Sequence, residues 1–209
     1  MKILFFGDSI TDASRERSHC GILRFGGGYV RYIAGKLYEK SPVEYNVINH
    51  GISGDRVVDL YARVKRDVWN ENPDYLSILI GINDIWHDLS ATPNGVDIKR
   101  FEKVYRALIE DTLERLPDLK IILCEPFVLK GSATEEKYSQ FLQVKDYAKV
   151  VKQIAKDYNL YYVPLQKALD EQAEKYGPSV FLADGVHPTE QGSTVIANEW
   201  LKLFESICK

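Results

Sequence analysis

The chain has 209 residues, of which 45% are hydrophobic and 27% are charged, which is the usage of an ordinary globular protein. Disordered, collagen-like and coiled-coil chains are therefore excluded. The net charge is −3, so electrostatics give no reason to expect nucleic acid or an anionic membrane as the main partner. We expect a small-molecule partner instead.

Short apolar runs, rich in branched and aromatic residues, alternate along the chain with stretches of helical periodicity. The runs predict strands buried on both faces at residues 3–6, 45–48, 76–80, 121–124 and 160–163. The amphipathic stretches predict helices over residues 55–69, 101–116, 138–158 and 190–207. This alternation is typical of βαβ units, so we predict an α/β fold, a three-layer α/β/α sandwich around a flavodoxin-like, five-stranded parallel sheet. No linker interrupts the pattern, and we predict one domain over residues 1–209.

The cysteines and the apolar segments bear on the compartment. Cys20, Cys124 and Cys208 lie far apart and show neither metal-binding spacing nor a disulfide framework. Cys124 follows three aliphatic residues, which predicts a reduced, buried thiol. The apolar run near the N-terminus is too short for a signal peptide, and no segment has the length of a membrane span. These features predict a cytoplasmic protein that does not insert into a membrane.

Ligands of such sheets bind at the carboxyl ends of the strands, so the residues after each apolar run are the candidate site residues. Ser9 follows the first run, a glycine-rich turn that contains Gly54 follows the second, and Asn83 follows the third. Taken alone, the Ser9 and Gly54 segments are better explained as a turn or a helix cap, and Asn83 can equally be a residue that stabilises a turn. The G-x-S-x-G elbow of the α/β-hydrolases is absent, because Thr11 occupies its last position.

Two aspartate–histidine pairs have the same three-residue spacing. Asp184 and His187 lie just before the last predicted helix, and Asp84 and His87 lie just after the third predicted strand. In either pair the carboxylate can accept from Nδ1–H, which leaves Nε2 free to take a proton. Spacing alone does not choose between the two pairs.

Together these residues supply what acyl transfer needs, namely a nucleophile, a base, a group that orients the base, and oxyanion donors. At these residues the sequence resembles the SGNH hydrolases, also called the GDSL-type esterases. The resemblance runs from Gly-Asp-Ser-Ile at residues 7–10, through Gly54 and Gly-Ile-Asn-Asp at residues 81–84, to the pair at residues 184 and 187.

The resemblance implies a role for each candidate residue. Ser9 would be the nucleophile, His187 the general base and Asp184 the residue that orients it. The oxyanion hole would consist of the backbone N–H groups of Ser9 and Gly54 and the side-chain amide of Asn83. We expect neither a cofactor nor a metal.

A closer resemblance is to the acetyl-xylan esterases and other carbohydrate acetyl esterases of that family, through residues 7–12, 28–30, 49–54 and 81–86. It implies a serine esterase that removes short acyl groups, chiefly acetyl, from a carbohydrate such as an acetylated xylo-oligosaccharide through an acyl-enzyme. The candidate substrate-binding residues are Asp8, Tyr29, Trp86 and His87.

Several alternatives stay open at this point. One is a lysophospholipase or thioesterase of the same family. Another is a metal-dependent phosphoesterase with Asp8, Asp12 and Asp184 around a cation, because carboxylates at strand ends suit hard metal ions. A third is a non-catalytic sugar-binding module. The sequence is compatible with a homo-oligomer, and residues 86–96 are predicted to be either a loop over the pocket or a subunit contact.

Overall fold

The structure of the chain is a computed structural model that describes residues 1–18 and 21–208. Five parallel strands form a sheet in the order β2-β1-β3-β4-β5, which is the flavodoxin-like order that the sequence predicts. The strands are β1 (Lys2–Gly7), β2 (Asn46–Gly51), β3 (Tyr75–Leu79), β4 (Lys120–Cys124) and β5 (Tyr161–Val163). Four of them match the predicted runs closely, whereas β2 continues three residues further than predicted because Asn49, His50 and Gly51 pair with β1.

Helices cover both faces of this sheet. The longer ones are α2 (Tyr29–Lys40), α3 (Val57–Val64), α5 (Ile98–Arg115), α7 (Val144–Asp157), α8 (Gln166–Tyr176) and α9 (Glu190–Ile207). Short helices are α1 (Ser9–Asp12), α4 (Ile82–Trp86) and α6 (Tyr138–Phe141), and single turns are η1 (Lys65–Trp69), η2 (His87–Leu89), η3 (Glu135–Lys137) and η4 (Pro178–Val180). The predicted helix 138–158 is therefore two helices, the predicted helix 55–69 ends in a π-helical turn, and α2 and α8 were not predicted.

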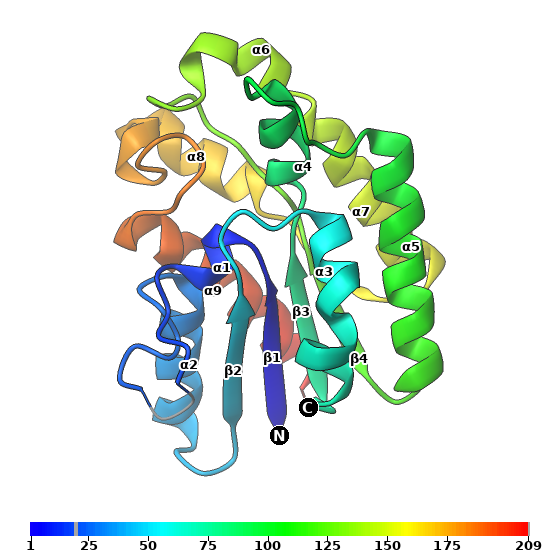
Figure 1. The fold of residues 1–209 in the computed structure, drawn as a ribbon. Helices are drawn as coiled ribbons and strands as arrows, with labels where there is room; N and C mark the ends of the chain where they lie inside the picture. Colours follow the sequence, from blue (N-terminus) through cyan, green and yellow to red (C-terminus); the bar gives the residue numbers. More distant parts are fainter. Residues whose placement is uncertain (19–20, 209) are drawn as a thin grey trace.

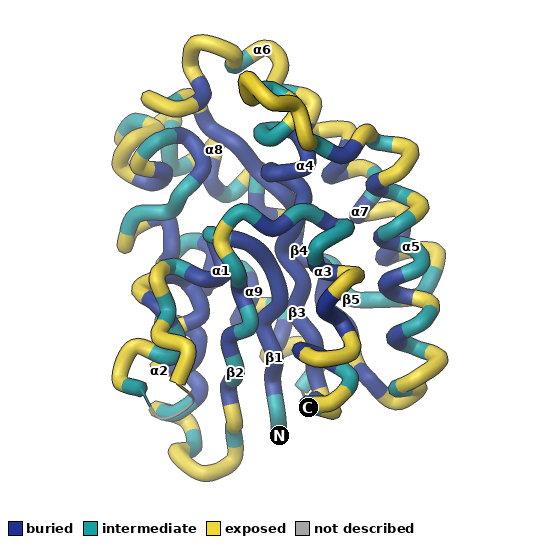
Figure 2. Tube along the Cα trace, in the orientation of Figure 1, coloured by how far each residue is buried: buried dark blue, intermediate teal, exposed yellow. Residues whose placement is uncertain are grey.

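The helices form two outer layers. Helices α3, α5 and α7 lie together on one face, and α2 and α9 lie together on the other, with α8 beside α9 (Figure 1). The strands and the inner sides of the helices are buried, whereas the outer sides of the helices are exposed (Figure 2). The α/β/α sandwich is thus confirmed. No helix in the part of the chain that the structure describes is long and apolar enough to cross a membrane.

Two details of side-chain burial follow from this packing. On α3, Tyr61 is 40% exposed and its hydroxyl donates to Asp111, whereas the neighbouring Leu60 is buried. Cys124, at the end of β4, is a free, buried thiol, and burial raises its pKa to about 12. The expectation of a reduced, buried Cys124 is confirmed, while Cys20 lies outside the described residues.

The register of the sheet decides where the candidate site residues meet. Gly7, the last residue of β1, is aligned with Gly51 of β2 and with Leu79 of β3. Strands β1, β2 and β3 therefore end at one level, and the segments that carry Ser9, Gly54 and Asn83 all start from that level.

Candidate active site

Ser9 is the first residue of the one-turn helix α1, which begins directly after β1. Asp8 caps this helix, because its Oδ1 accepts from the backbone N–H of Ile10 at 3.0 Å. The first N–H groups of a helix have no partner within the helix. The cap therefore holds Ser9 at the end of the sheet, with its own N–H among those groups.

A chain of hydrogen bonds joins Ser9 to the segment before α9. Ser9 Oγ lies 2.9 Å from Nε2 of His187, and Nδ1 of His187 lies 2.7 Å from Oδ2 of Asp184. The structure therefore brings together the serine, histidine and aspartate singled out in the sequence, although the serine comes from the opposite end of the chain.

A tight turn holds the carboxylate of Asp184 in place. Its Oδ1 accepts from the backbone N–H groups of Val186 at 2.9 Å and His187 at 2.8 Å. Gly185 adopts a φ of +99°, which L side chains rarely adopt. Burial opposes ionisation of Asp184, but the hydrogen bonds from His187 and Val186 outweigh it, so the pKa of this carboxyl lies below its usual value. An ionised carboxylate accepts from Nδ1–H and so favours the tautomer whose Nε2 can take the proton of Ser9.

The two other predicted oxyanion residues lie on neighbouring turns. Gly54 has a φ of +87°, and a Cβ built on it would meet nothing within 4 Å. Asn83 is buried in α4, and its side-chain amide donates to the backbone oxygen of Asp55 at 3.0 Å. Because this amide has two N–H groups, the bond to Asp55 orients it and leaves the second N–H for a ligand.

Asp12 ties the Gly54 turn to α1, a contact that the sequence did not reveal. Its Oδ2 accepts from both the N–H and the hydroxyl of Ser53 at 3.0 Å, and from Arg17 at 2.8 Å. The backbone next to Gly54 is thus held against the helix that begins with Ser9.

Arg63, a buried residue of α3, braces the same region. Its guanidinium donates to the backbone oxygens of Gly7 at 3.1 Å and His50 at 2.9 Å, and to the carboxylates of Asp55 and Asp67, each at 2.6 Å. The guanidinium of Arg63 therefore binds the ends of β1 and β2 and also Asp55, the residue that follows Gly54. A sequence signal existed, because Arg63 and Asp67 lie four residues apart next to the apolar face of a predicted helix.

The second aspartate–histidine pair does not form a hydrogen-bonded couple. Both carboxylate oxygens of Asp84 accept from the backbone N–H of Val57, at 3.1 and 3.3 Å, and so cap the start of α3. Burial, reinforced by the nearby charge of Asp8, raises the pKa of Asp84 to about 8. Burial likewise raises the pKa of Asp8 to about 7.

For two of the predicted substrate-binding residues, the structure contradicts the prediction. Tyr29 is fully buried, with its hydroxyl 3.0 Å from the Thr11 hydroxyl and its ring against Phe5. Asp8 is also fully buried and caps α1. Both side chains serve the scaffold, since Tyr29 packs in the core and Asp8 holds the start of α1.

The other two predicted substrate-binding residues lie on or next to α4 and are half-buried. The ring of Trp86 lies 5.9 Å from the ring of His187 and packs edge-on against Phe141. The backbone oxygen of His87 accepts from Ser90 and Asn94. A substrate contact of Trp86 or His87 stays a prediction.

The carboxylates proposed for a metal site do not gather. Among residues 1–18 and 21–208, no group of three or more His, Cys, Asp or Glu side chains is placed so that it could hold a metal ion. Asp8 caps a helix, Asp12 binds Ser53 and Arg17, and Asp184 binds His187. The phosphoesterase alternative therefore lacks its ligand set.

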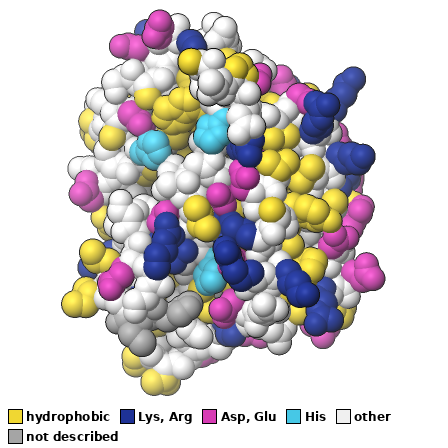
Figure 3. Space-filling model, viewed as in Figure 1, with side chains coloured by type: hydrophobic (Ala, Val, Ile, Leu, Met, Phe, Trp, Pro, Cys, Tyr) yellow, Lys and Arg dark blue, Asp and Glu magenta, His cyan; other side chains and the backbone are white. Residues whose placement is uncertain are grey.

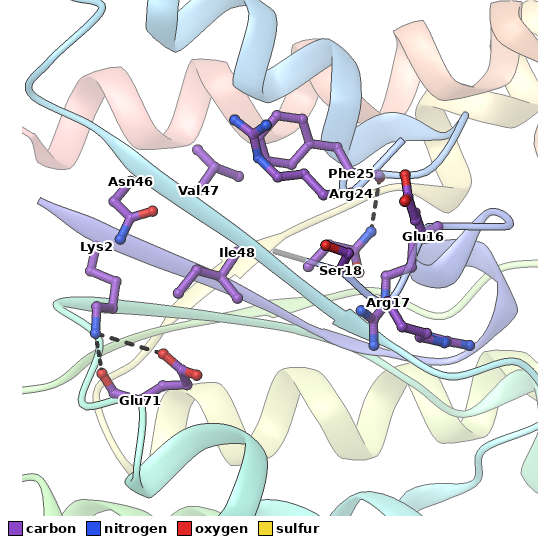
Figure 4. Close-up of a pocket in the computed structure, with 12 residues that line it drawn as sticks. Lys2, Glu16, Arg17, Ser18, Arg24, Phe25, Asn46, Val47, Ile48 and Glu71 are labelled. Carbon is purple, nitrogen blue, oxygen red and sulfur yellow. Dashed lines mark hydrogen bonds and ion pairs between the residues drawn. The ribbon is translucent and has the colours of Figure 1, made fainter. Parts of the chain in front are cut away.

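Two hollows lie near these residues. The first, the Ser9 cavity, has a volume of about 420 Å³ and is lined by Ser9, Ile10, Ala13, Ser14, Gly27, Gly28, Ser53, His187, Pro188 and Ser193. The second, the β2 groove, has about 310 Å³ and runs along the edge strand β2 past Arg15, Arg17 and the ion pair of Lys2 with Glu71 (Figure 4). Of the candidate site residues, Ser9 and His187 line the first hollow, and none of them lines the second.

The surface around the site carries mixed charge. On the face shown in Figure 3, basic and acidic side chains are interspersed, in keeping with the net charge of −3. Such a surface favours no large polyanion as a ligand.

Comparisons with known proteins agree with this geometry. Residues 5–195 match the model of the GDSL-like lipase/acylhydrolase family. An acetylxylan esterase from Geobacillus stearothermophilus is 39% identical over 209 residues, covering 96% of this chain and 92% of that protein. Its crystal structure superposes with a TM-score of 0.85 at 36% identity over 96% and 92% of the two chains.

Further solved structures extend the match. The crystal structure of a protein of Parabacteroides merdae that carries the name GDSL-like lipase has a TM-score of 0.91 at 37% identity, covering 98% of this chain and 95% of that one. Structures of the Geobacillus esterase include three variants called catalytic mutants, in which a serine, an aspartate or a histidine is replaced by alanine.

Proposed function

We propose that this chain, which belongs to the GDSL-like lipase/acylhydrolase family and is a carboxylic ester hydrolase, removes acetyl groups from an acetylated carbohydrate such as a xylo-oligosaccharide. The observation that carries the proposal is the unbroken chain of hydrogen bonds from Ser9 Oγ through His187 to Asp184, at 2.9 and 2.7 Å. The acetylated carbohydrate is supported by the similarity to an acetylxylan esterase.

The reaction begins at the Ser9 hydroxyl. Nε2 of His187 takes the hydroxyl proton while Oγ forms a bond to the ester carbonyl carbon. The carboxylate of Asp184 accepts from Nδ1–H throughout and so stabilises the imidazolium. The low pKa of Asp184 keeps that carboxylate ionised at neutral pH.

The carbonyl oxygen gains the negative charge in this step. The N–H groups of Ser9 and Gly54 and the second N–H of the Asn83 amide stabilise it, and they cost no reorganisation because the protein has already fixed them. Asp12 and Arg63 act at a distance, by holding the turns that carry these donors.

Collapse of the tetrahedral intermediate completes the first half. His187 returns its proton to the alcohol oxygen, the carbon–oxygen bond of the ester breaks, and an acyl group remains on Ser9. Water then attacks the acyl-enzyme, with His187 again as the base, and acetate leaves as Ser9 regains its proton.

The test is a rate panel combined with labelling of Ser9. We expect the highest kcat/KM for acetylated xylosides, lower values for other acetylated sugars, and falling values for p-nitrophenyl esters of increasing chain length. An organophosphonate should add to Ser9 in the wild type and to no serine in Ser9→Ala, while Ser206→Ala, changed at an exposed helical serine, should react like the wild type.

Two results would contradict the proposal. Highest rates on lysophospholipids or thioesters would assign the chain to the other acyl hydrolases of the family. Full activity of Ser9→Ala would remove the serine mechanism altogether.

A further inference from the structure

We propose that the Ser9 cavity holds the alcohol half of the ester, and that it accepts a neutral, hydroxyl-rich alcohol about the size of a single sugar ring. The inference rests on the proposed function, because it concerns the substrate of the same serine. It places the alcohol, which is the part of the substrate that leaves first, on the side of Ser9 where the cavity lies.

The first argument is the direction of the cavity. In the tetrahedral intermediate the oxyanion points to Gly54 and Asn83, and the oxygen of the leaving alcohol must lie within reach of Nε2 of His187. The lining of the cavity includes Ser9 and His187 but neither Gly54 nor Asn83. A group inside the cavity is therefore next to the residue that protonates the leaving alcohol.

The second argument is volume. A water molecule occupies about 30 Å³, so an acetyl group with three heavy atoms fills only about 90 Å³ on the same scale. A pyranose with its oxygens, about ten heavy atoms, needs roughly 300 Å³. The cavity of about 420 Å³ is far larger than the acyl half requires and matches a ring.

The third argument is the chemistry of the walls. Besides Ser9, three more serines, Ser14, Ser53 and Ser193, line the cavity, and none of its lining residues is Lys, Arg, Asp or Glu. Such walls suit hydroxyl groups and offer no counter-ion to the phosphate of a lysophospholipid.

Ser193 adds a specific polar atom. It is 1% exposed, and its Oγ has no hydrogen-bond partner in the part of the chain that the structure describes. A buried hydroxyl without a partner is unfavourable. Because Ser193 lines the cavity, a ligand hydroxyl that reached this Oγ would supply the missing hydrogen bond.

Two adjacent glycines, Gly27 and Gly28, also line the cavity. The fold excludes a side chain at only one of them. A Cβ on Gly28 would lie 2.8 Å from the Cβ of Ala13 and 4.0 Å from Ser193 Oγ, so the fold itself excludes a side chain there. A Cβ on Gly27 would meet only the backbone oxygen of Ala13, at the ordinary distance of 3.8 Å, and Gly27 has no positive φ. The fold would tolerate a side chain at Gly27, and because this exposed residue lines the cavity, we expect a side chain there to compete with a ring for space.

The first experiment introduces side chains at Gly27 in order to reduce the space in the cavity. Wild type, Gly27→Ala and Gly27→Leu are assayed on an acetylated methyl xyloside and on ethyl acetate, which share the acyl group and differ in the alcohol. We expect Gly27→Leu to lower the ratio of kcat/KM for the xyloside to that for ethyl acetate at least tenfold, and Gly27→Ala to lower it less. Gly35→Leu is the matched control, because Gly35 is an exposed glycine of α2 with nothing within 4 Å of its Cβ position, and it should leave the ratio unchanged.

A second variant tests the hydrogen bond without filling the cavity. Ser193→Ala removes the unpartnered hydroxyl, and we expect about a fivefold higher KM for the xyloside, the effect of one ordinary hydrogen bond. The KM for ethyl acetate should change by less than twofold, because its alcohol has no further hydroxyl.

If the cavity held the acyl half of the ester instead, the variants would give a different pattern of rates. If Gly27→Leu leaves the ratio unchanged and instead alters the preference among ethyl acetate, propanoate and butyrate, the cavity holds the acyl half and the inference is wrong. If the wild type hydrolyses none of these esters, the proposed function itself fails, and this outcome is separate because it needs no variant.

Discussion

Residues 84–87 lie on α4 and the turn that follows it, whereas residues 184–187 lie in the non-helical turn before α9. Both segments carry an aspartate followed three residues later by a histidine, yet the carboxylates find different donors. Asp84 accepts from the backbone N–H of Val57, and Asp184 accepts from the imidazole of His187. The comparison teaches that the role of such a pair depends on the donor that the fold brings to the carboxylate.

The surroundings of the two carboxylates widen this difference. The side chain of Asp84 is buried, and burial raises its pKa to about 8. Asp184 keeps a partly exposed carboxylate, on which three hydrogen bonds outweigh burial and lower its pKa. One aspartate therefore supports the scaffold, and the other can stabilise a charged histidine.

The largest expected effect comes from exchanging the two histidines one at a time for glutamine. His187→Gln should lower kcat/KM roughly 10⁴-fold, because the serine loses its base, whereas His87→Gln should lower it only a few-fold. Steady-state rates on an acetyl ester measure both effects, and an equal or greater loss in His87→Gln would reverse the choice of the pair.

A smaller effect is expected at the neighbour of Asp84. Asn83→Ala should lower kcat about 10²- to 10³-fold with little change in KM, because the lost N–H acts mainly on the oxyanion. Asp84→Asn, one residue further on, keeps the scaffold contact to Val57 and should retain most of the turnover. Unchanged kcat in Asn83→Ala, with the fold intact by circular dichroism, would remove Asn83 from the oxyanion hole.

The last effect is on stability rather than on rate, and it has opposite signs for the two aspartates. The folded-state pKa of Asp84 is raised from 3.8 to about 8, so its contribution is complete below pH 4 and is lost as the pH rises through 8. Asp84→Asn should therefore gain stability over the wild type from pH 4 to 8, by at most about 1.4 kcal/mol per pH unit.

The folded-state pKa of Asp184 is lowered, so its contribution is present above its unfolded-state pKa and is lost as the pH falls through its folded-state pKa. Asp184→Asn should be less stable than the wild type near neutral pH, and the difference should vanish in acid. Urea unfolding of both variants and the wild type between pH 3 and 8 measures the two trends. Parallel curves for the two variants would contradict the assigned pKa directions.

Much of the architecture could be predicted from local pattern. The buried runs that became β1, β3, β4 and β5 are continuous and apolar, and the start and end of α9 match the predicted helix, with Thr189 capping its start. The end of β2 was missed because its last residues are polar and pair only when β1 lies beside them. The apolar spacing of α2 was available in the sequence and was overlooked.

Some residues of the candidate site could likewise be predicted from the sequence, and others could not. Ser9, Asn83 and the two aspartate–histidine pairs were visible as residue types at predicted strand ends. Tyr29 was placed in the substrate site and is instead buried against Phe5. The spacing of Arg63 and Asp67 was visible in the sequence, but the contacts of Arg63 with the backbone oxygens of Gly7 and His50 were not, because those residues are distant from it in the chain.

The order of strands and helices along the chain and the chemical groups that follow the strands were thus determined by the sequence itself. They depend on hydrophobic periodicity and on residue type, which are local properties. Tertiary structure alone decided which histidine meets Ser9, which carboxylate caps a helix, and which side chains line the cavity. Those outcomes depend on hydrogen-bond partners from remote segments, and only the packed sheet brings such partners within 3 Å of each other.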